Sequence, residues 1–432
     1  MRYLTLAPAV ALGLALPAVA QNPIDGMRPD APELAPYGAR PVGVTTQSFT
    51  DPDRIDVVRA TDDAAPTADR TITAEIWYPA AEGTEPGTDY TALMRDGATE
   101  VTLTGRAARE AQAAGGTFPL VVISHGYPGN RFLMSHLGEN LASKGYVVAS
   151  LDHPDSMYQD MGVFPSTLVN RPVDQAFMVD ALTGWADHPV GAMIDDDAVG
   201  IVGYSMGGYG ALIYAGGGLS QAAIERREPS WYNAPGELLA RNAAGADAHA
   251  ALADPAVKAV VAIGPWGRNR DFWDAAGLAG VAKPLMIVAG GVDDVSSYPA
   301  IRQIFEETTG TDRLLLTFEN ANHNAAAPMP APEAAWQVSE ATGEYHFDHY
   351  ADAVWDNVRM NNILQHFVTA FMDLNLKGEA EKAEYLDLVE LAADGVIDRA
   401  EDGTEGPDHS YWKGFADRSA HGLRLERRAA GK

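Results

Sequence analysis

The chain has 432 residues, 46% of them apolar, which is enough to bury a large core in one big domain or two small ones. It contains no cysteine, and this excludes disulfides, thiolate metal ligands, a cysteine nucleophile and a lipid-modified cysteine. A formal net charge of −28 makes nucleic acid and anionic membrane surfaces poor partners.

The first twenty residues have the pattern of a secretory signal peptide. Arg2 gives a positive start, residues 4–16 form a short apolar stretch, and Ala18-Val19-Ala20 is a cleavage motif before Gln21. The apolar run is too short for a membrane anchor. We therefore expect cleavage after Ala20, a secreted or periplasmic protein, and no membrane association afterwards.

The following segments predict an α/β architecture. Residues 21–40 contain four prolines and predict an extended linker. Short apolar or alternating runs then predict strands at 72–78, 118–124, 146–151, 199–203, 257–263, 285–289 and 313–318. Between them, helical periodicity predicts helices at 131–144, at 172–185 with Pro172 in the first position, at 206–215, and over a long stretch ending near 377. Such alternation is typical of a mostly parallel sheet with helices on both faces, here over residues 41–378.

Two segments interrupt the alternation. Residues 217–254, which include Trp231 and Tyr232, are too long for a simple connection, and residues 325–352 precede the last helix. Both follow strand ends, where open α/β sheets bind their ligands. We expect 217–254 to form a cap that lines the pocket, with Trp231 among its residues; surface decoration is the alternative. Residues 379–432 form an acidic extension without a predicted role.

The strongest motif is Gly203-Tyr204-Ser205-Met206-Gly207-Gly208, between a predicted buried strand and a predicted helix. In this setting Gly-x-Ser-x-Gly predicts a nucleophile elbow, a strained turn that exposes the serine hydroxyl. The glycines let the strand and the helix approach closely, and the N-terminus of the helix favours developing negative charge. We predict that Ser205 is the nucleophile.

A serine nucleophile needs a base and an acid that orients the base. His323 follows the last predicted strand, at the place where this arrangement presents its histidine. Asp293, three residues after a predicted strand, is the expected acid, and its neighbour Asp294 is the less favoured alternative. The order serine, aspartate, histidine is that of α/β-hydrolases.

The oxyanion of the reaction needs preorganised donors. One is predicted to be the backbone N–H of Met206. The other should come from the loop after strand 118–124; Pro128 has no N–H, so Gly126 or Tyr127 remains, and Tyr127 fits better. We expect His125 to hold this loop. His153, after another strand, either lines the pocket or caps its own loop.

These motifs resemble the α/β-hydrolase superfamily, within it dienelactone-hydrolase-like proteins, platelet-activating-factor acetylhydrolases and cutinase-like polyester hydrolases. The resemblance covers about residues 41–378 and rests on residues 122–126, 141–148 and 203–208 and on the Asp293/His323 pair. Dienelactone hydrolases proper use a cysteine nucleophile, which this chain lacks. Platelet-activating-factor acetylhydrolases look as though they place the acid one strand earlier, where this chain has no carboxylate.

The polyester hydrolases have a Gly-Tyr oxyanion loop, Ser-Met-Gly-Gly, and Pro-Trp after the next strand. Gly126-Tyr127, Ser205-Met206-Gly207-Gly208 and Pro265-Trp266 match all three. The resemblance implies that Trp266 is an aromatic wall for the acyl group, with ordinary core packing as the alternative.

The combined reading is an exported serine hydrolase that cleaves carboxylic esters, with short acyl groups preferred because the insertion 217–254 should narrow access. Neither a metal nor an organic cofactor is expected. The alternatives are an exported peptidase or amidase on the same scaffold and a cutinase-like polyester hydrolase. A non-enzymatic binding module is disfavoured by the intact triad.

Overall fold

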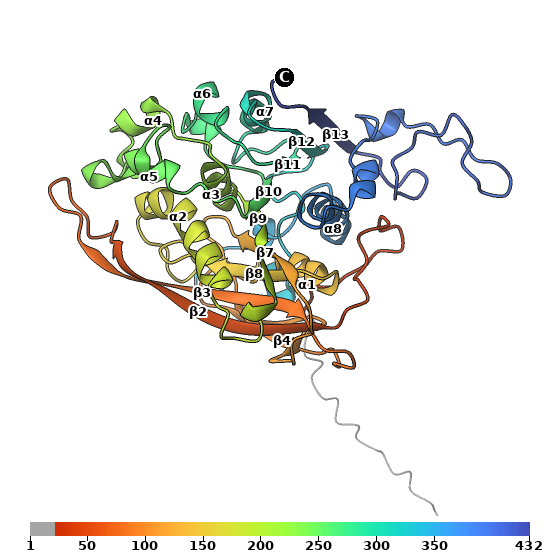
Figure 1. Ribbon diagram of the computed structural model, residues 1–432, viewed down its shortest axis with the longest axis horizontal. Coiled ribbons are helices and arrows are strands. Elements are labelled where there is room, and N and C mark those ends of the chain that lie inside the picture. The colour runs from red at the N-terminus through yellow and green to blue at the C-terminus, as the bar shows by residue number, and fades with distance from the viewer. Residues whose placement is uncertain (1–21) are drawn as a thin grey trace, which may run out of the picture.

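A ten-stranded mixed sheet forms the centre of the protein (Figure 1), in the order β13-β12-β11-β10-β9-β7-β8-β3-β2-β6. The computed structural model describes residues 22–432, so the predicted signal peptide lies outside the described residues. The strands of the large sheet are β2 (Val42–Ile55), β3 (Thr67–Pro79), β6 (Ala108–Arg109), β7 (Phe118–Ser124), β8 (Val147–Asp152), β9 (Ile194–Tyr204), β10 (Val257–Ile263), β11 (Leu285–Gly290), β12 (Arg313–Phe318) and β13 (Leu423–Arg428). A small second sheet contains β1 (Asn22–Pro23), β4 (Asp89–Leu93) and β5 (Glu100–Thr104).

Helices cover both faces of the large sheet. They are α1 (Ser135–Ser143), α2 (Phe164–Thr183), α3 (Met206–Tyr214), α4 (Gln221–Glu225), α5 (Asp247–Ala250), α6 (Ala275–Leu278), α7 (Tyr298–Glu307) and α8 (Asn357–Met372). One face carries α1 and α8, and the other carries α2, α3 and α7 (Figure 1). The strands from β7 to β12 are parallel and almost wholly buried, as expected when both faces are covered. The predicted α/β class is confirmed.

The order β8-β7-β9 places the point where the strand order reverses between β7 and β9. In open parallel sheets, ligands bind beyond the carboxyl ends of the strands at such a point. The loop after β7 and the turn after β9 meet there, and these segments contain Tyr127 and Ser205.

Helix α2 begins eight residues before the predicted start, so Pro172 lies inside it. A proline removes the N–H that would bond the carbonyl four residues earlier, here that of Leu168. This carbonyl instead accepts hydrogen bonds from Tyr209 Oη at 3.1 Å and Asn242 Nδ2 at 3.3 Å. Because donors from α3 and from the insertion replace the lost one, the helix continues through the proline.

The C-terminal boundary predicted at residue 378 is wrong. Strand β13 lies in the predicted extension and pairs antiparallel with β12, completing the large sheet. Trp412, Phe415 and Leu423 are buried in the same core as α8. This arrangement covers the edge of β12, which would otherwise be exposed for pairing.

The predicted linker packs along the domain in an extended form. Glu33 N donates to Gly414 O at 2.7 Å, and Leu34 N donates to His366 Nδ1 at 3.1 Å. The N-terminal segment therefore contacts both α8 and the C-terminal extension.

The insertion 217–254 contains α4, α5 and two 3₁₀ segments, Ser230–Tyr232 and Pro235–Asn242. It lies against α2, where Asn242 Nδ2 also donates to Val169 O at 3.2 Å. Within residues 22–432, no helix is both long and apolar enough to cross a membrane.

Candidate active site

Ser205 occupies a strained turn between β9 and α3. Its φ is 52°, a left-handed conformation that costs a residue with a Cβ about 1–2 kcal/mol. The glycines on either side make the turn possible. A Cβ at position 203 would lie 2.2 Å from Gly207 O, and a Cβ at position 207 would lie 2.0 Å from Ser124 O. The geometry is that of a nucleophile elbow.

The three residues of the predicted triad are hydrogen-bonded in a row. The Oγ of Ser205 lies 3.0 Å from His323 Nε2, and His323 Nδ1 lies 2.7 Å from Asp293 Oδ2. The side chain of Asp293 is fully buried, and that of His323 is 11% exposed. Asp293 can therefore fix the proton of His323 on Nδ1, which leaves Nε2 free to accept the serine proton.

The carboxylate of Asp293 is held from its second oxygen. Oδ1 accepts hydrogen bonds from the backbone N–H groups of Val295 at 2.9 Å and Ser296 at 2.8 Å. Asp294, the alternative acid in the sequence, is exposed and makes no such contacts among the described residues. Only Asp293 reaches the histidine.

The segment 325–352 supports the histidine loop from the other side. Asn324 Nδ2 donates to the carbonyls of Asp348 and Ala351, and Asn324 Oδ1 accepts from Tyr204 Oη at 3.0 Å. Asn322 N donates to Asp352 Oδ2 at 2.6 Å. His323 thus lies between two residues that are tied to this segment.

Two backbone donors are available next to Ser205. Within residues 22–432, neither the N–H of Tyr127 nor that of Met206 has a hydrogen-bond acceptor. Gly126 lets the loop approach, since a Cβ there would lie 3.3 Å from Ser205 Cβ. These are the two N–H groups predicted for the oxyanion.

His125 and His153 lie behind this loop. The ring of His125 contacts Gly126 O through Nδ1 at 2.7 Å and accepts the backbone N–H of His153 on Nε2 at 3.2 Å. His153 uses both ring nitrogens, with Ser124 Oγ at 2.8 Å and Asp174 Oδ2 at 3.1 Å, and is 1% exposed. Burial lowers the pKa of His153 to about 3, so its ring is neutral at neutral pH. Contrary to expectation, His153 supports the loop and does not line the pocket.

An aromatic cluster lies beside the oxyanion loop. Trp266 packs with ring centroids 5.6 Å from Phe164 and 5.7 Å from Tyr232, and Phe164 packs 4.9 Å from Tyr127. The sequence analysis did not single out Phe164, which follows a loop without a helical start signal. Trp231 is 59% exposed and touches the cluster only through Tyr232, at 6.0 Å. The insertion therefore reaches the cluster with Tyr232, and Trp231 points to solvent.

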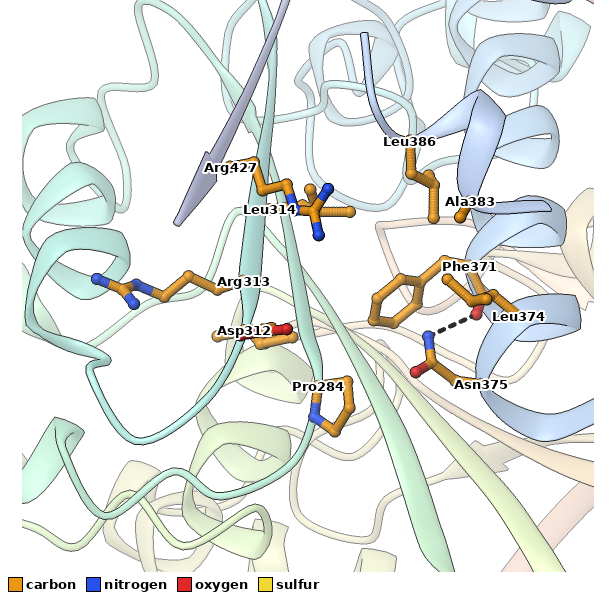
Figure 2. Close-up of a pocket in the computed structure, with 11 residues that line it drawn as sticks. Pro284, Asp312, Arg313, Leu314, Phe371, Leu374, Asn375, Ala383, Leu386 and Arg427 are labelled. Carbon is orange, nitrogen blue, oxygen red and sulfur yellow. Dashed lines mark hydrogen bonds between the residues drawn. The ribbon is translucent and has the colours of Figure 1, made fainter. Parts of the chain in front are cut away.

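A separate cavity of about 140 Å³ lies at the opposite edge of the sheet (Figure 2). It begins where β11 and β12 begin, whereas Asp293 and His323 follow the ends of these strands. Figure 2 shows Phe371, Leu374 and Asn375 on one side and Leu314 and Arg427 on the other. The lining contains no nucleophile and no acid–base pair, so the chemistry belongs to the Ser205 site. No cluster of three metal-ligating side chains occurs in the described part of the chain.

Comparisons with known proteins agree with this site. A family model described as PET hydrolase-like matches residues 105–231, and one described as platelet-activating factor acetylhydrolase, isoform II, matches residues 37–163. The chain is 23% identical to cutinase est1 of Thermobifida alba over 215 residues, which are 48% of this chain and 54% of the cutinase. It is 24% identical to bis(hydroxyethyl) terephthalate hydrolase of Streptomyces coelicolor over 232 residues, 52% of this chain and 56% of that protein. The chain thus spans little more than half the length of these relatives.

The fold has a solved counterpart. A ferulic acid esterase from Streptomyces cinnamoneus superposes with a TM-score of 0.56 at 20% identity, covering 81% of this chain and 94% of that chain. The protein has the α/β-hydrolase fold. The predicted resemblance to the group of polyester hydrolases and platelet-activating-factor acetylhydrolases is confirmed, and the likeness to dienelactone hydrolases stays a prediction.

Proposed function

We propose that this protein hydrolyses carboxylic esters through an acyl-enzyme formed on Ser205. The observation that carries the proposal is the hydrogen-bonded row of Ser205, His323 and Asp293, with distances of 3.0 and 2.7 Å. The row ends beside two backbone N–H groups without acceptors. The PET hydrolase-like match and the cutinase relatives support the same reaction class.

In the first half of the reaction, Ser205 Oγ attacks the acyl carbon while its proton passes to His323 Nε2. The bond to the alcohol then breaks, and His323 returns the proton to the departing alkoxide. In the second half, water attacks the acyl-enzyme, gives its proton to His323, and releases the acid and free Ser205. The N–H groups of Tyr127 and Met206 stabilise the oxyanion in both halves. No step needs a metal or an organic cofactor.

The aromatic cluster supports an acyl site walled by Trp266, Phe164 and Tyr232. Because Tyr232 comes from the insertion, it narrows the space beside Trp266 and favours short acyl groups. Polyester hydrolysis is the second candidate, favoured by the match to bis(hydroxyethyl) terephthalate hydrolase and by the Pro265-Trp266 motif.

The N-terminal pattern supports export, with the mature chain starting at Gln21. The mass of the protein recovered from the periplasm or the medium tests this part: a species that retains residues 1–20 would contradict it.

A panel of chromogenic esters with graded acyl length, assayed beside Ser205→Ala, tests the main proposal. We expect hydrolysis of acetate and butyrate esters, with kcat/KM falling beyond about six carbons as the pocket fills, and no activity in the variant. Equal rates on long-chain esters or polyester film would favour the second candidate. Activity that survives in Ser205→Ala would refute the mechanism.

A further inference from the structure

Helix α2 carries a buried arginine that the sequence analysis did not single out. Arg171 is 1% exposed, and within the described residues no carboxylate lies within 4.0 Å of its guanidinium. Its donors go to His125 O and Ser156 Oγ, with a long contact of 3.5 Å to Gly126 O. Burial lowers its pKa to about 9, which still leaves it charged at neutral pH. A buried charge without a paired carboxylate is expensive to keep, so its partners indicate its purpose.

The partners of Arg171 belong to the oxyanion loop. Arg171 holds the carbonyl of His125, and the ring of His125 holds the next carbonyl, that of Gly126, at 2.7 Å. Because Nε2 of His125 accepts the N–H of His153, the ring proton lies on Nδ1 and is donated to Gly126 O. Burial and the charge of Arg171 lower the pKa of His125 well below its ordinary value, which preserves this neutral tautomer.

The carbonyl of Gly126 belongs to the same peptide unit as the N–H of Tyr127. In a trans peptide these two groups point in opposite directions, so fixing the oxygen also fixes the direction of the N–H. A donor on the carbonyl further polarises the peptide and makes its N–H a stronger donor.

The same face of α2 also holds the nucleophile side of the site. Gln175, one turn after Arg171, donates from Nε2 to Gly207 O at 3.0 Å in the first turn of α3. Gly210 leaves room for Arg171, since a Cβ there would lie 2.5 Å from Arg171 Cγ. Helix α2 therefore contacts the segments that carry both predicted oxyanion donors.

We propose that Arg171 is a positioning residue for the oxyanion site: through the carbonyl of His125 and the ring of His125, it orients and polarises the Gly126–Tyr127 peptide so that the Tyr127 N–H faces the tetrahedral oxyanion. Its uncompensated positive charge, one peptide away, adds to the stabilisation of that oxyanion. The inference rests on the proposed ester hydrolysis and assigns to α2 a part in transition-state binding.

The test combines kinetics with binding of phenylboronic acid, which forms a tetrahedral adduct with a serine nucleophile. In Arg171→Met we expect kcat to fall about 10- to 100-fold with KM nearly unchanged, less than the loss of an oxyanion donor itself. The affinity for phenylboronic acid should fall by the same factor, because the adduct uses the same N–H groups. Arg171→Lys keeps the charge without the planar fork and should recover part of both losses.

Arg313 provides the matched control. It is also 1% exposed and also donates to backbone carbonyls, those of Phe305, Glu306 and Lys432, far from Ser205. Arg313→Met should lower thermal stability but leave kcat and boronate affinity as in the unaltered protein. A folded Arg171→Met with unaltered kcat and boronate affinity, or losses equal to those of Arg313→Met, would overturn the inference. If Arg171→Met does not fold, Arg171→Lys gives the same comparison. An unaltered protein that hydrolyses no ester would contradict the proposed function, a separate result.

Discussion

Gly264 lies against the imidazole of His323: a Cβ at position 264 would be 3.2 Å from both Nδ1 and Cε1 of the ring. It would also lie 3.4 Å from Asp293 Oδ2, and the φ of Gly264 is +50°. The absence of a side chain after β10 is therefore part of the geometry that lets the histidine meet its acid.

Gly264→Ala should impair catalysis more than stability. A methyl group at this place pushes the ring out of line with Ser205, and small misplacements of reacting groups cost about 10- to 100-fold in rate. We expect such a loss of kcat, measured on a short-acyl ester. Gly343→Ala is the matched control, because Gly343 also has positive φ (+73°) but a Cβ there meets nothing within 4 Å. Both variants should lose about 1 kcal/mol of stability from the left-handed backbone. Equal kcat losses in the two variants would contradict the steric account.

Asp293→Asn should lower kcat by about 10³- to 10⁴-fold, because an amide can hold His323 in the wrong tautomer. Asp294→Asn removes the same charge one residue away from an exposed side chain and should leave kcat nearly unchanged. The ratio of the two kcat values is the measurement. Comparable losses would show that the charge of this loop matters and that the contact with His323 does not.

Much of this site could be predicted from the sequence. Ser205, Asp293 and His323 were each predicted from the end of a strand, and all three strands end there because parallel strands share one carboxyl edge. Arg171 could not be predicted, since it lies in a helix whose start was misplaced. Pro172 indicated a first turn, and only the donors Tyr209 and Asn242, distant in sequence, allow the helix to continue through it.

The predicted domain boundary failed for a similar reason. The last strand, β13, reads Leu-Arg-Leu-Glu-Arg-Arg, a short charged segment with little strand signal of its own. It becomes a strand because the edge of β12 offers it hydrogen bonds. The role of Trp231 was misjudged because the sequence does not say which of two adjacent aromatics faces inward.

Tyr232 should set the acyl-length preference, and Trp231 should not. Removing the ring of Tyr232 opens space beside Trp266, so Tyr232→Ala should raise kcat/KM for long acyl chains relative to acetate by about 10-fold or more. Trp231→Ala removes a ring that is 59% exposed and should leave the profile unaltered. The readout is the ratio of kcat/KM for octanoate and acetate esters. A shift in Trp231→Ala alone would assign the covering role to the wrong residue.

Acid should destabilise the attachment of the N-terminal segment to α8. Burial, with Lys144 and Lys382 nearby, lowers the pKa of His366 from 6.5 to about 3, and its Nδ1 accepts the N–H of Leu34 only while it is unprotonated. Between these two pKa values the unfolded chain binds a proton that the folded chain does not, so stability is lost as the pH falls below 6.5. His366→Asn keeps an acceptor at this place and does not titrate.

The slope of unfolding free energy against pH, from urea titrations between about pH 5 and 6.5, should therefore be smaller in His366→Asn by up to about 1.4 kcal/mol per pH unit. His421→Asn, at an exposed position, provides the reference slope. An equal slope in His366→Asn and in the unaltered protein would contradict this account, whatever the absolute stability of the variant.

The central claim is that Ser205 is the nucleophile of an ester hydrolase, and covalent labelling tests it most directly. A fluorophosphonate should label the mature protein at one site, and peptide mapping by mass spectrometry should locate the adduct on Ser205, with loss of ester hydrolysis in proportion to labelling. Ser205→Ala should stay folded and take up no label. An adduct on a different serine, or full ester hydrolysis by the completely labelled protein, would contradict the account.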